Sequence, residues 1–349
     1  MTGIHTAAMT DDIWNDTPSV PVYHDVDRAL FENEIKPANC PVLMKGLGAH
    51  WPLVEKGRQG PEALAAYLRS HANTQPVQAF IGAAAIEGRF AYTDDLKGFN
   101  FERQAMPVGD LLDALLARLD EEGDALYAGG IPVPAHLPTM DADNPMPLLE
   151  PGSDRLVSAW IGNRTRIPAH WDLPQNIAVV AAGRRRYTLF PIEQVANLYV
   201  GPLDLTLAGQ PSSLVDFHAP DFGRFPKFRE AMKAAQIADL EPGDAVYVPP
   251  MWWHHVESFT SFGMLMNYWW REGPDYMVTP FFTLLHALTT LRDLPAPERA
   301  AWRVMFDHYI FRLDGEPMDH VPMDARGIFA DMTPDNLRRL KGFLASKLQ

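Results

Sequence analysis

Residues between positions 170 and 255 have the types and spacing of a metal site. His170 and Asp172 are separated by one residue, and His254 and His255 follow much later. On a strand, residues two apart point to the same side, so His170 and Asp172 can reach one metal from one strand end. Neighbours on a strand face opposite ways, so spacing alone does not choose between His254 and His255 as a third ligand. Two histidines and one carboxylate form the facial set of non-heme Fe(II) oxygenases, which leaves coordination positions open.

This pattern alone is a weak signal. With 12 His and 44 acidic residues in 349, chance gives about 1.5 such pairs, and the chain has a second one at His255 and Glu257. His170 follows a Pro-Ala pair and Asp172 precedes Leu-Pro, which places the first pair where a strand meets a turn. A histidine with ordinary hydrogen bonds at a barrel mouth is the competing interpretation. Glu257 would be a ligand only if His255 faced inward.

The residues around this pattern predict a β-rich core. Short β-branched and aromatic runs alternate with Pro and Gly turns, which is typical of a sheet sandwich or barrel. These runs cover residues 156–161, 177–181, 186–190, 245–248, 255–258 and 264–269. Before them, residues 40–46 predict a buried strand, residues 61–71 a helix that starts at a proline, and residues 108–121 an amphipathic helix.

The pattern becomes helical again after Pro280. Helices are predicted over residues 281–291 and 297–311, and Thr333 predicts an N-cap before a helix that runs to about residue 348. The fold class is therefore mainly β with flanking helices. We expect a flexible lead over residues 1–20, a catalytic domain with N-terminal helical elements over 21–275, and a helical region over 276–349.

Composition narrows the class of protein. Apolar residues make up 47% of the chain, enough for a substantial core. The formal net charge of -14 argues against nucleic acid or an anionic membrane as the main partner. Cys40 is the only cysteine, which excludes an intrachain disulfide and a thiolate-rich metal site. We expect a cytoplasmic protein, because neither a signal peptide nor a membrane span is visible in the sequence.

Six short motifs follow one another within residues 155–272. They are P-A-H-x-D-x-x-x-N, G-x-[KR]-R-x-x-L-F-P, V-D-F-x-x-P-D-[FY]-x-R-F-P-x-F, P-G-D-x-x-Y-[IV]-P, W-W-H-H-[IV]-E-S and N-[FY]-W. In this order they resemble the JmjC-type, cupin-like family of Fe(II)- and 2-oxoglutarate-dependent oxygenases, which includes the asparaginyl hydroxylase of hypoxia-inducible factor. The resemblance implies a double-stranded β-helix core of the cupin or jelly-roll kind.

The resemblance also implies the iron ligands. The first His of the W-W-H-H pair binds iron in this family, so the implied set is His170, Asp172 and His254. The far carboxylate of 2-oxoglutarate would meet Arg185, where the asparaginyl hydroxylase has Lys. Arginine can form two parallel hydrogen bonds with a carboxylate, so the exchange is chemically sensible. Strand alternation predicts that Arg185 points inward, unlike its neighbours.

Further positions of the expected pocket follow from the same resemblance. Tyr127 resembles a tyrosine that helps to hold the far carboxylate, and Asn176 and Asn267 match asparagines near the iron and the co-substrate. Ser212 stands where the hydroxylase grips its substrate with Gln, and Trp269 matches a tryptophan beside that substrate. A structural alternative exists for each, since core tyrosines, turn amides and core aromatics are common.

The resemblance implies a hydroxylase that couples its reaction to the decarboxylation of 2-oxoglutarate to succinate and CO2. Ile167 departs from the family pattern, because the hydroxylase has a hydrogen-bonding Thr there. Asparagine hydroxylation is therefore not transferred, and the expected substrate is a protein or peptide side chain or a small amino-acid-like molecule. The C-terminal helices are expected to form a homodimer. The alternatives are a metal-binding cupin that acts as a non-catalytic sensor or binding module, and a cupin isomerase or hydrolase.

Overall fold

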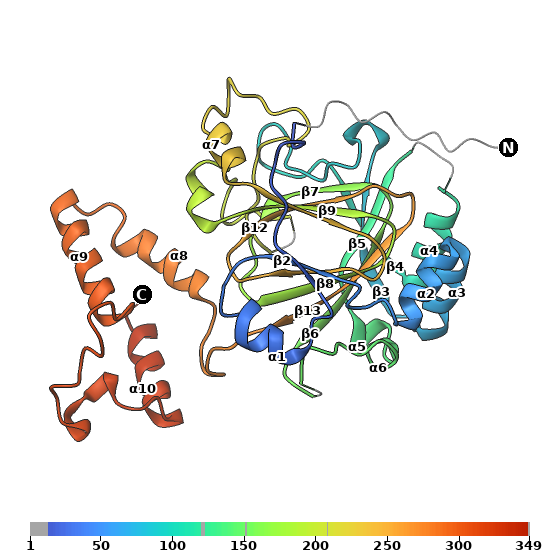
Figure 1. Ribbon diagram of the computed structural model, residues 1–349. Helices are drawn as coiled ribbons and strands as arrows, with labels where there is room; N and C mark the ends of the chain where they lie inside the picture. The colour runs from blue at the N-terminus through green and yellow to red at the C-terminus, as the bar shows by residue number, and fades with distance from the viewer. Residues whose placement is uncertain (1–12, 120–122, 151, 208, 348–349) are drawn as a thin grey trace. The chain divides into compact units, whose positions relative to one another are not determined.

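The computed structural model describes residues 13–119, 123–150, 152–207 and 209–347 (Figure 1). The chain divides into two compact units, Met1–Arg271 and Glu272–Gln349. This division lies close to the boundary expected after residue 275. The larger unit contains all strands of the described chain, and the smaller unit is helical.

Two sheets form the core of the larger unit. The nine-stranded sheet has the order β1 (Val22–His24), β2 (Val42–Lys45), β11 (Ala245–Val248), β8 (Gln175–Ala182), β13 (Gly263–Trp270), β6 (Leu156–Gly162), β5 (Ala125–Pro132), β3 (Pro76–Gly82) and β4 (Glu102–Pro107). The four-stranded sheet has the order β10 (Gln236–Leu240), β9 (Arg185–Phe190), β12 (Trp253–Ser258) and β7 (Thr165–His170). The two sheets with their flanking helices confirm the predicted cupin or jelly-roll fold class.

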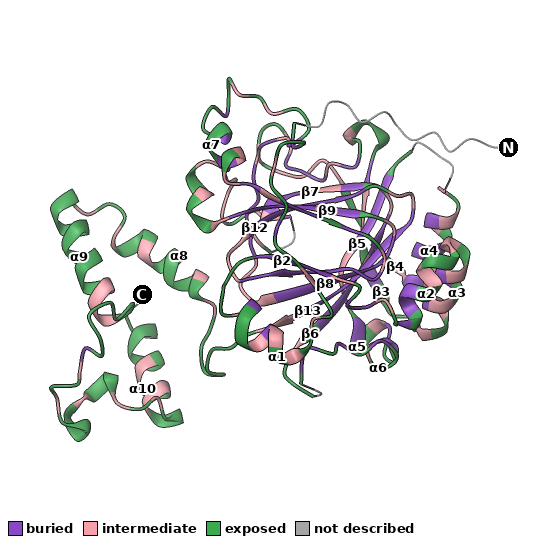
Figure 2. Cartoon of the chain, in the orientation of Figure 1, coloured by how far each residue is buried: buried purple, intermediate pink, exposed green. Residues whose placement is uncertain are grey.

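The position of strand β8 between two regions of the core explains why its sequence is almost continuously apolar. Ile177 and Val179 belong to the outer core under the helices, whereas Ala178 and Val180 belong to the inner core shared with the four-stranded sheet. Successive side chains of a strand point to opposite faces, so both faces of β8 require apolar residues. The central strands of both sheets are accordingly buried along most of their length (Figure 2).

Helices cover the outer face of the nine-stranded sheet. Helix α2 (Pro52–Gln59), helix α3 (Pro61–His71) and helix α4 (Val108–Leu116) all contribute buried residues to the outer core. Helix α3 has the predicted bounds. Helix α4 is shorter than the predicted 108–121, because Ala117 closes its last turn and the chain continues as a turn; residues 120–122 lie outside the described chain.

The segment before β1 corrects the predicted flexible lead. Trp14 is only 3% exposed, and its indole Nε1 donates to the carbonyl of Phe217 at 3.1 Å. Val20 is also buried, and its backbone N–H donates to the carbonyl of Ile237. Residues 13–20 therefore pack on the core through partners more than 200 positions away, and residues 1–12 lie outside the described chain.

The sequence did not predict five strands of the two sheets, β1, β3, β4, β5 and β10. Strand β4 has four exposed residues at its start, so it lacks the alternation of a half-buried strand. Strand β5 is interrupted by Gly129 and Gly130, where the pairing with β6 changes register. Gly130 has a φ of 65°, which lies in the left-handed region that favours glycine.

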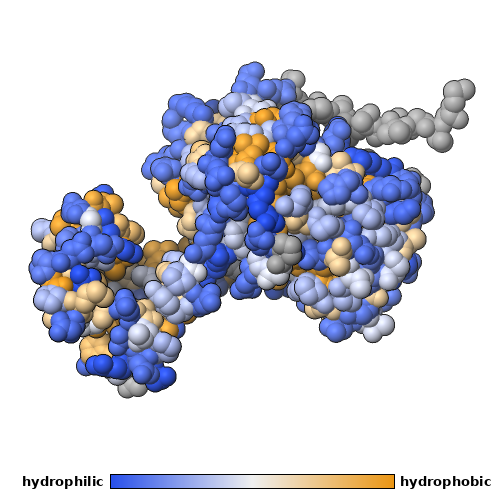
Figure 3. All heavy atoms as spheres, turned by 60° about the horizontal axis from the view of Figure 1, so that its bottom comes forward, coloured by the Kyte–Doolittle hydropathy of each residue, from blue (hydrophilic) through white to orange (hydrophobic). Residues whose placement is uncertain are grey.

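The smaller unit contains three main helices, α8 (Pro280–Thr290), α9 (Ala296–Tyr309) and α10 (Pro334–Ala345). The predicted cap of α10 is confirmed: the Thr333 side chain accepts from the N–H of Asn336, and Pro334 follows it. None of these helices has a buried residue, and apolar side chains are visible on the surface of this unit (Figure 3). Among the described residues, no helix has the length and apolar character needed to cross a bilayer.

Candidate metal centre

The two candidate histidine ligands stand on neighbouring strands. His170 ends β7, and His254 lies directly opposite it on β12. Residues that face each other across antiparallel strands point to the same side of the sheet, and the two ring centroids lie 4.3 Å apart. The pairing of β7 with β12 therefore places both imidazoles at one point of the barrel interior.

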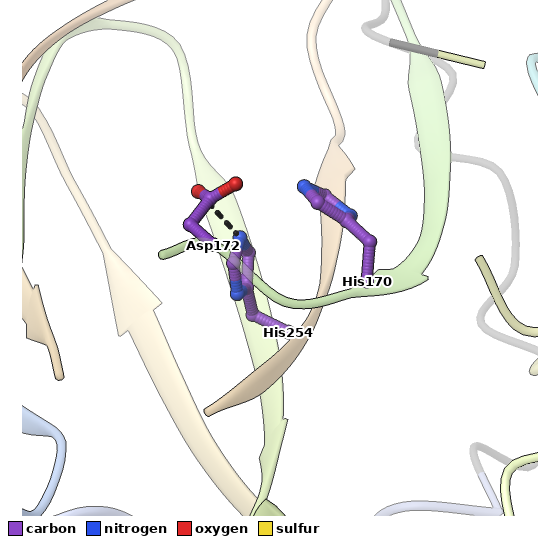
Figure 4. Close-up of side chains that lie close together, drawn as sticks. All are labelled: His170, Asp172 and His254. Atoms are coloured by element: carbon purple, nitrogen blue, oxygen red, sulfur yellow. Dashed lines mark ion pairs between the residues drawn. The ribbon is translucent and has the colours of Figure 1, made fainter. Parts of the chain in front are cut away.

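Asp172 completes the cluster from the turn that follows β7. Its Oδ2 atom lies 3.5 Å from Nε2 of His254 (Figure 4). One ligand atom from each of His170, Asp172 and His254 lies within 4.8 Å of the others, which leaves space for one ion between them. The turn is fixed by the backbone of Asp172, whose carbonyl accepts from the N–H of Met251 at 2.8 Å.

His255 faces away from this cluster. Its ring lies 4.5 Å from the ring of Phe217, and its Nε2 lies 3.8 Å from a carboxylate oxygen of Glu257. Glu257 also receives a hydrogen bond from His218. The choice that spacing left open is thus resolved geometrically: His254, and not His255, shares the cluster with His170.

Hydrogen bonds to the backbone set the tautomers of both ligand histidines. Nδ1 of His170 lies 2.9 Å from the carbonyl of Pro168, and Nδ1 of His254 lies 3.0 Å from the carbonyl of Trp252. A carbonyl can only accept, so both Nδ1 atoms carry the proton. Each Nε2 therefore keeps its lone pair for a metal, in the arrangement that commonly orients histidine ligands.

The protonation states suit metal binding. Burial and the neighbouring His254 lower the pKa of His170 to about 4, so the ring is neutral at pH 7. Burial alone would raise the pKa of Asp172, but its neighbours His254 and His170 outweigh burial and lower that pKa. The cluster thus offers two imidazole nitrogens and a carboxylate, a donor set that fits Fe(II) and related divalent ions.

An inner cavity extends from the cluster between the two sheets. Arg185, Tyr127, Asn176 and Asn267 line it together with His170, Asp172 and His254. All four residues that the sequence associated with a co-substrate therefore lie around one space. Asn267 accepts from Nε1 of Trp160 at 2.7 Å and lies 3.5 Å from Asn176, so the two amides are held next to each other.

Arg185 is the unusual member of this cavity. It is 3% exposed, whereas Arg184 is exposed and Arg186 pairs with Asp239. The Nε of Arg185 has no hydrogen-bond partner, and its Nη2 reaches only the carbonyl of Trp160 at 3.4 Å. No carboxylate of the described residues forms an ion pair with it, and its electrostatic neighbours are Tyr127 and Tyr187.

A buried arginine remains charged and is costly without a counter-ion. The unpaired guanidinium of Arg185 therefore indicates an anionic ligand in this cavity. Together with the donor set of the metal cluster, it shows that the residues present fit both a divalent ion and a carboxylate-bearing co-substrate.

Tyr187 and Trp160 also line the inner cavity, and the sequence analysis did not single them out. Burial raises the pKa of Tyr187 to about 12, so its hydroxyl stays protonated at neutral pH. Tyr187 lies two residues after Arg185 on β9, and strand alternation from Arg185 could have identified it. Nothing local in the sequence marks Trp160.

A second, larger cavity also borders the cluster. It has a volume of about 520 Å³, and His170, Asp172, Tyr127, Ser212 and Trp269 line it. The two residues that the sequence associated with substrate therefore lie in this outer cavity. Ser212 is 3% exposed, and Trp269 and Tyr127 line both cavities.

Comparison with known proteins gives a consistent result. Residues 28–276 match the family model of the cupin-like domain. The chain is 24% identical to lysine-specific demethylase 8 of Xenopus tropicalis over 258 residues, which cover 72% of this chain and 53% of the relative. It is 23% identical to lysine-specific demethylase JMJ31 of Arabidopsis thaliana over 284 residues, which cover 71% of this chain and 50% of the relative.

A shorter match adds a different kind of relative. The tRNA wybutosine-synthesizing protein 5 of Gallus gallus is 33% identical over 105 residues, 30% of either chain. The chain spans about half the length of the two demethylases that it matches. The family match covers most of the larger unit and all three residues of the metal cluster. The chain therefore belongs to the JmjC-like family of cupin-like domain proteins.

Proposed function

We propose that this protein is an Fe(II)- and 2-oxoglutarate-dependent oxygenase that hydroxylates a peptide side chain or a small amino-acid-like molecule. The observation that carries the proposal is Arg185, a buried cation without an acidic partner among the described residues. It shares one cavity with the cluster of His170, Asp172 and His254. A metal ion and an arginine would lie at two different places in one cavity. This arrangement favours a ligand with two acidic groups, one for the metal and one for the arginine, such as a dicarboxylic keto acid.

The residues around the cavity have distinct roles in this proposal. His170, Asp172 and His254 would hold the iron, and Arg185 would hold the far carboxylate of 2-oxoglutarate through two parallel hydrogen bonds. Burial raises the pKa of Tyr127, so its hydroxyl is a donor at neutral pH and would assist Arg185. When bound, iron and 2-oxoglutarate would supply the activation of dioxygen, with succinate and CO2 as co-products.

The remaining polar residues would orient the ligand. Asn176 and Asn267 lie next to each other on the cavity wall, where their amides can bond to a carboxylate or keto oxygen. Ile167 also lines the cavity and offers no donor. Arg185 with its free Nε therefore has to replace the hydrogen bond that a hydroxyl at position 167 would give.

The experiment is anaerobic reconstitution with Fe(II), followed by aerobic turnover of 2-oxoglutarate to succinate, measured by proton NMR without a prime substrate. We expect slow succinate formation by the wild type and none by His170→Ala. The matched control is His24→Ala, since His24 lies exposed on β1. For the co-substrate, Arg185→Met is compared with Arg184→Met, because Arg184 is exposed.

Two outcomes separate the proposal from its alternative. Succinate from the wild type and from both controls, but not from His170→Ala, supports the oxygenase. Stoichiometric iron with neither succinate formation nor 2-oxoglutarate binding would contradict it and favour a non-catalytic sensor or binding module. Release of formaldehyde with an N-methylated substrate would show that hydroxylation ends in demethylation, the activity named for two of the relatives.

A further inference from the structure

The lining of the outer cavity differs in its content of cationic and anionic side chains. Apart from Asp172, which belongs to the metal cluster, the described residues of its lining include no carboxylate and one cation, Arg103. No local pattern in the sequence marks Arg103, because it lies on the polar edge strand β4. With Asp172 committed to the metal, the part of the lining that the structure describes offers a substrate a positive charge and no negative one.

Cross-strand register places Arg103 on a path toward the metal cluster. Arg103 of β4 lies opposite Phe80 of β3, and Phe80 lies opposite Tyr127 of β5. Side chains in such a row point to the same face of the sheet, and neighbouring strands lie about 4.8 Å apart. Arg103 thus lies two strand spacings, or about 10 Å, from Tyr127, which itself lines both cavities.

Burial increases along this row. Arg103 is exposed, Phe80 is half-buried and Tyr127 is 4% exposed. The row therefore begins with Arg103 at the rim of the cavity, where its charge is solvated. It continues along the aromatic side chains of Phe80 and Tyr127 toward the metal cluster. A ligand with a polar end and an apolar body matches this gradient.

The Arg103 guanidinium is held in place at the rim. It lies over the rings of Phe80, Phe99 and Phe101, at 5.3, 5.5 and 5.9 Å from their centroids. Its Nη2 donates to the carbonyl of Leu207 at 2.8 Å. No carboxylate of the described residues forms an ion pair with it. Arg103 therefore has a fixed position and unused donors, which is the preorganisation that carboxylate binding favours.

A second donor lines the same cavity without a partner. The indole Nε1 of Trp269 is buried and has no hydrogen-bond partner among the described residues. An indole N–H can only donate. The cavity therefore has donors to offer at Arg103 and at Trp269, and its substrate should be rich in acceptors.

We propose that the prime substrate is a small organic anion, with a carboxylate that Arg103 binds and an apolar or aromatic body that lies along Phe80 toward the metal. This inference rests on the proposed function and names its substrate class. Because the guanidinium already occupies the aromatic faces, a second cation there would be repelled. The cavity therefore selects against the cationic side chain of a methylated lysine. Its volume of about 520 Å³ is within the usual range for small-molecule sites.

The test is isothermal titration calorimetry on the anaerobic protein loaded with Fe(II) and 2-oxoglutarate. It uses three small molecules that share a phenyl ring and differ in the charge of the group attached to it. The probes are phenylacetate, phenylacetamide and phenethylamine. We expect phenylacetate to bind about tenfold more tightly than phenylacetamide, as one charge-assisted hydrogen bond allows, and phenethylamine to bind most weakly. Arg103→Gln should remove this preference, Arg103→Lys should retain part of it, and the exposed control Arg184→Gln should leave it unchanged.

The same titration without iron and 2-oxoglutarate separates this inference from the proposed function. If an Arg103-dependent preference for phenylacetate persists while 2-oxoglutarate itself fails to bind, the cavity assignment stands and the proposed function falls. Tightest binding of phenethylamine, or a preference for phenylacetate that survives Arg103→Gln, would overturn the inference while leaving the proposed function intact.

Discussion

The ring of Tyr187 lies nearly parallel to the ring of His254, with an interplanar angle of 28° and centroids 6.3 Å apart. Tyr187 shares the inward face of β9 with Arg185, two residues earlier. One side chain thus lies between the proposed metal ligand and the proposed anchor of the co-substrate. Its bulk restricts how far the imidazole can turn.

Replacement of Tyr187 should therefore weaken metal binding through ring packing. We expect Tyr187→Leu to lose about tenfold in Fe(II) affinity, the lower end of the range for residues that support metal ligands, and Tyr187→Phe to retain most of it. Anaerobic metal titration measures both. Tyr309→Leu, in the C-terminal unit, is the control. Equal losses in the Phe and Leu variants would show that the hydroxyl, rather than the ring, is responsible.

Arg185→Met should raise the stability of the ligand-free protein. The variant removes a buried charge that has no acidic partner among the described residues, and it keeps most of the side-chain volume. We expect a gain of about 1–2 kcal/mol in the free energy of unfolding and the loss of any stabilisation by 2-oxoglutarate. Thermal unfolding with and without 2-oxoglutarate measures both. A destabilised variant would indicate that Arg185 supports the fold rather than a ligand.

Glu257 should make folding sensitive to acid. It is 4% exposed; burial alone would raise its pKa, but the hydrogen bond from His218 and the neighbouring His255 hold that pKa well below its usual range. A lowered folded-state pKa contributes stability above the unfolded value of about 4.3, and this stability is lost as the pH falls below it. We expect Glu257→Gln to cost about 2 kcal/mol at pH 7 and much less near pH 3.

Urea unfolding across this pH range checks the prediction. Glu193→Gln is the matched control, because Glu193 is exposed and should change stability by less than about 0.5 kcal/mol. A cost of Glu257→Gln that stays the same from pH 7 to pH 3 would contradict the proposed electrostatic cause.

The homodimer expected from the sequence stays a prediction. Phe282, Leu284 and Leu288 of α8 are 60%, 49% and 36% exposed, and this helix has no buried residue. A dimer that covers this face would have twice the chain mass of 39.1 kDa in light scattering. We expect Leu284→Asp with Leu288→Asp to yield monomers and Thr283→Asp to remain dimeric. A wild-type monomer at micromolar concentration would rule the dimer out.

The sequence predicted the structure correctly where a strand or helix follows a regular local pattern. Alternation along β9 placed Arg185 in the interior, and cap chemistry placed the start of α10 at Thr333. Strand β4 was not predicted, because its exposed residues show no alternation of apolar and polar side chains. The packing of Trp14 on the core was not predicted, because its partner Phe217 lies 203 positions away. No local sequence pattern indicates such a contact.

The separation of the two cavities could not be predicted from the sequence. The motifs near His170 and His254 identify the metal cluster, but they do not show that Arg103 joins the outer cavity from an edge strand. That contact depends on the register of β4, β3 and β5, which pairs Arg103 with Phe80 and Phe80 with Tyr127.

Both candidate ligand histidines are oriented by carbonyls two residues earlier in the chain. Neither tautomer depends on a second side chain. Wall residues such as Arg103 can then be exchanged without rebuilding the ligands. Substitutions on β3 and β4 could then alter the preferred substrate while the strand ends that carry His170 and His254 stay unchanged.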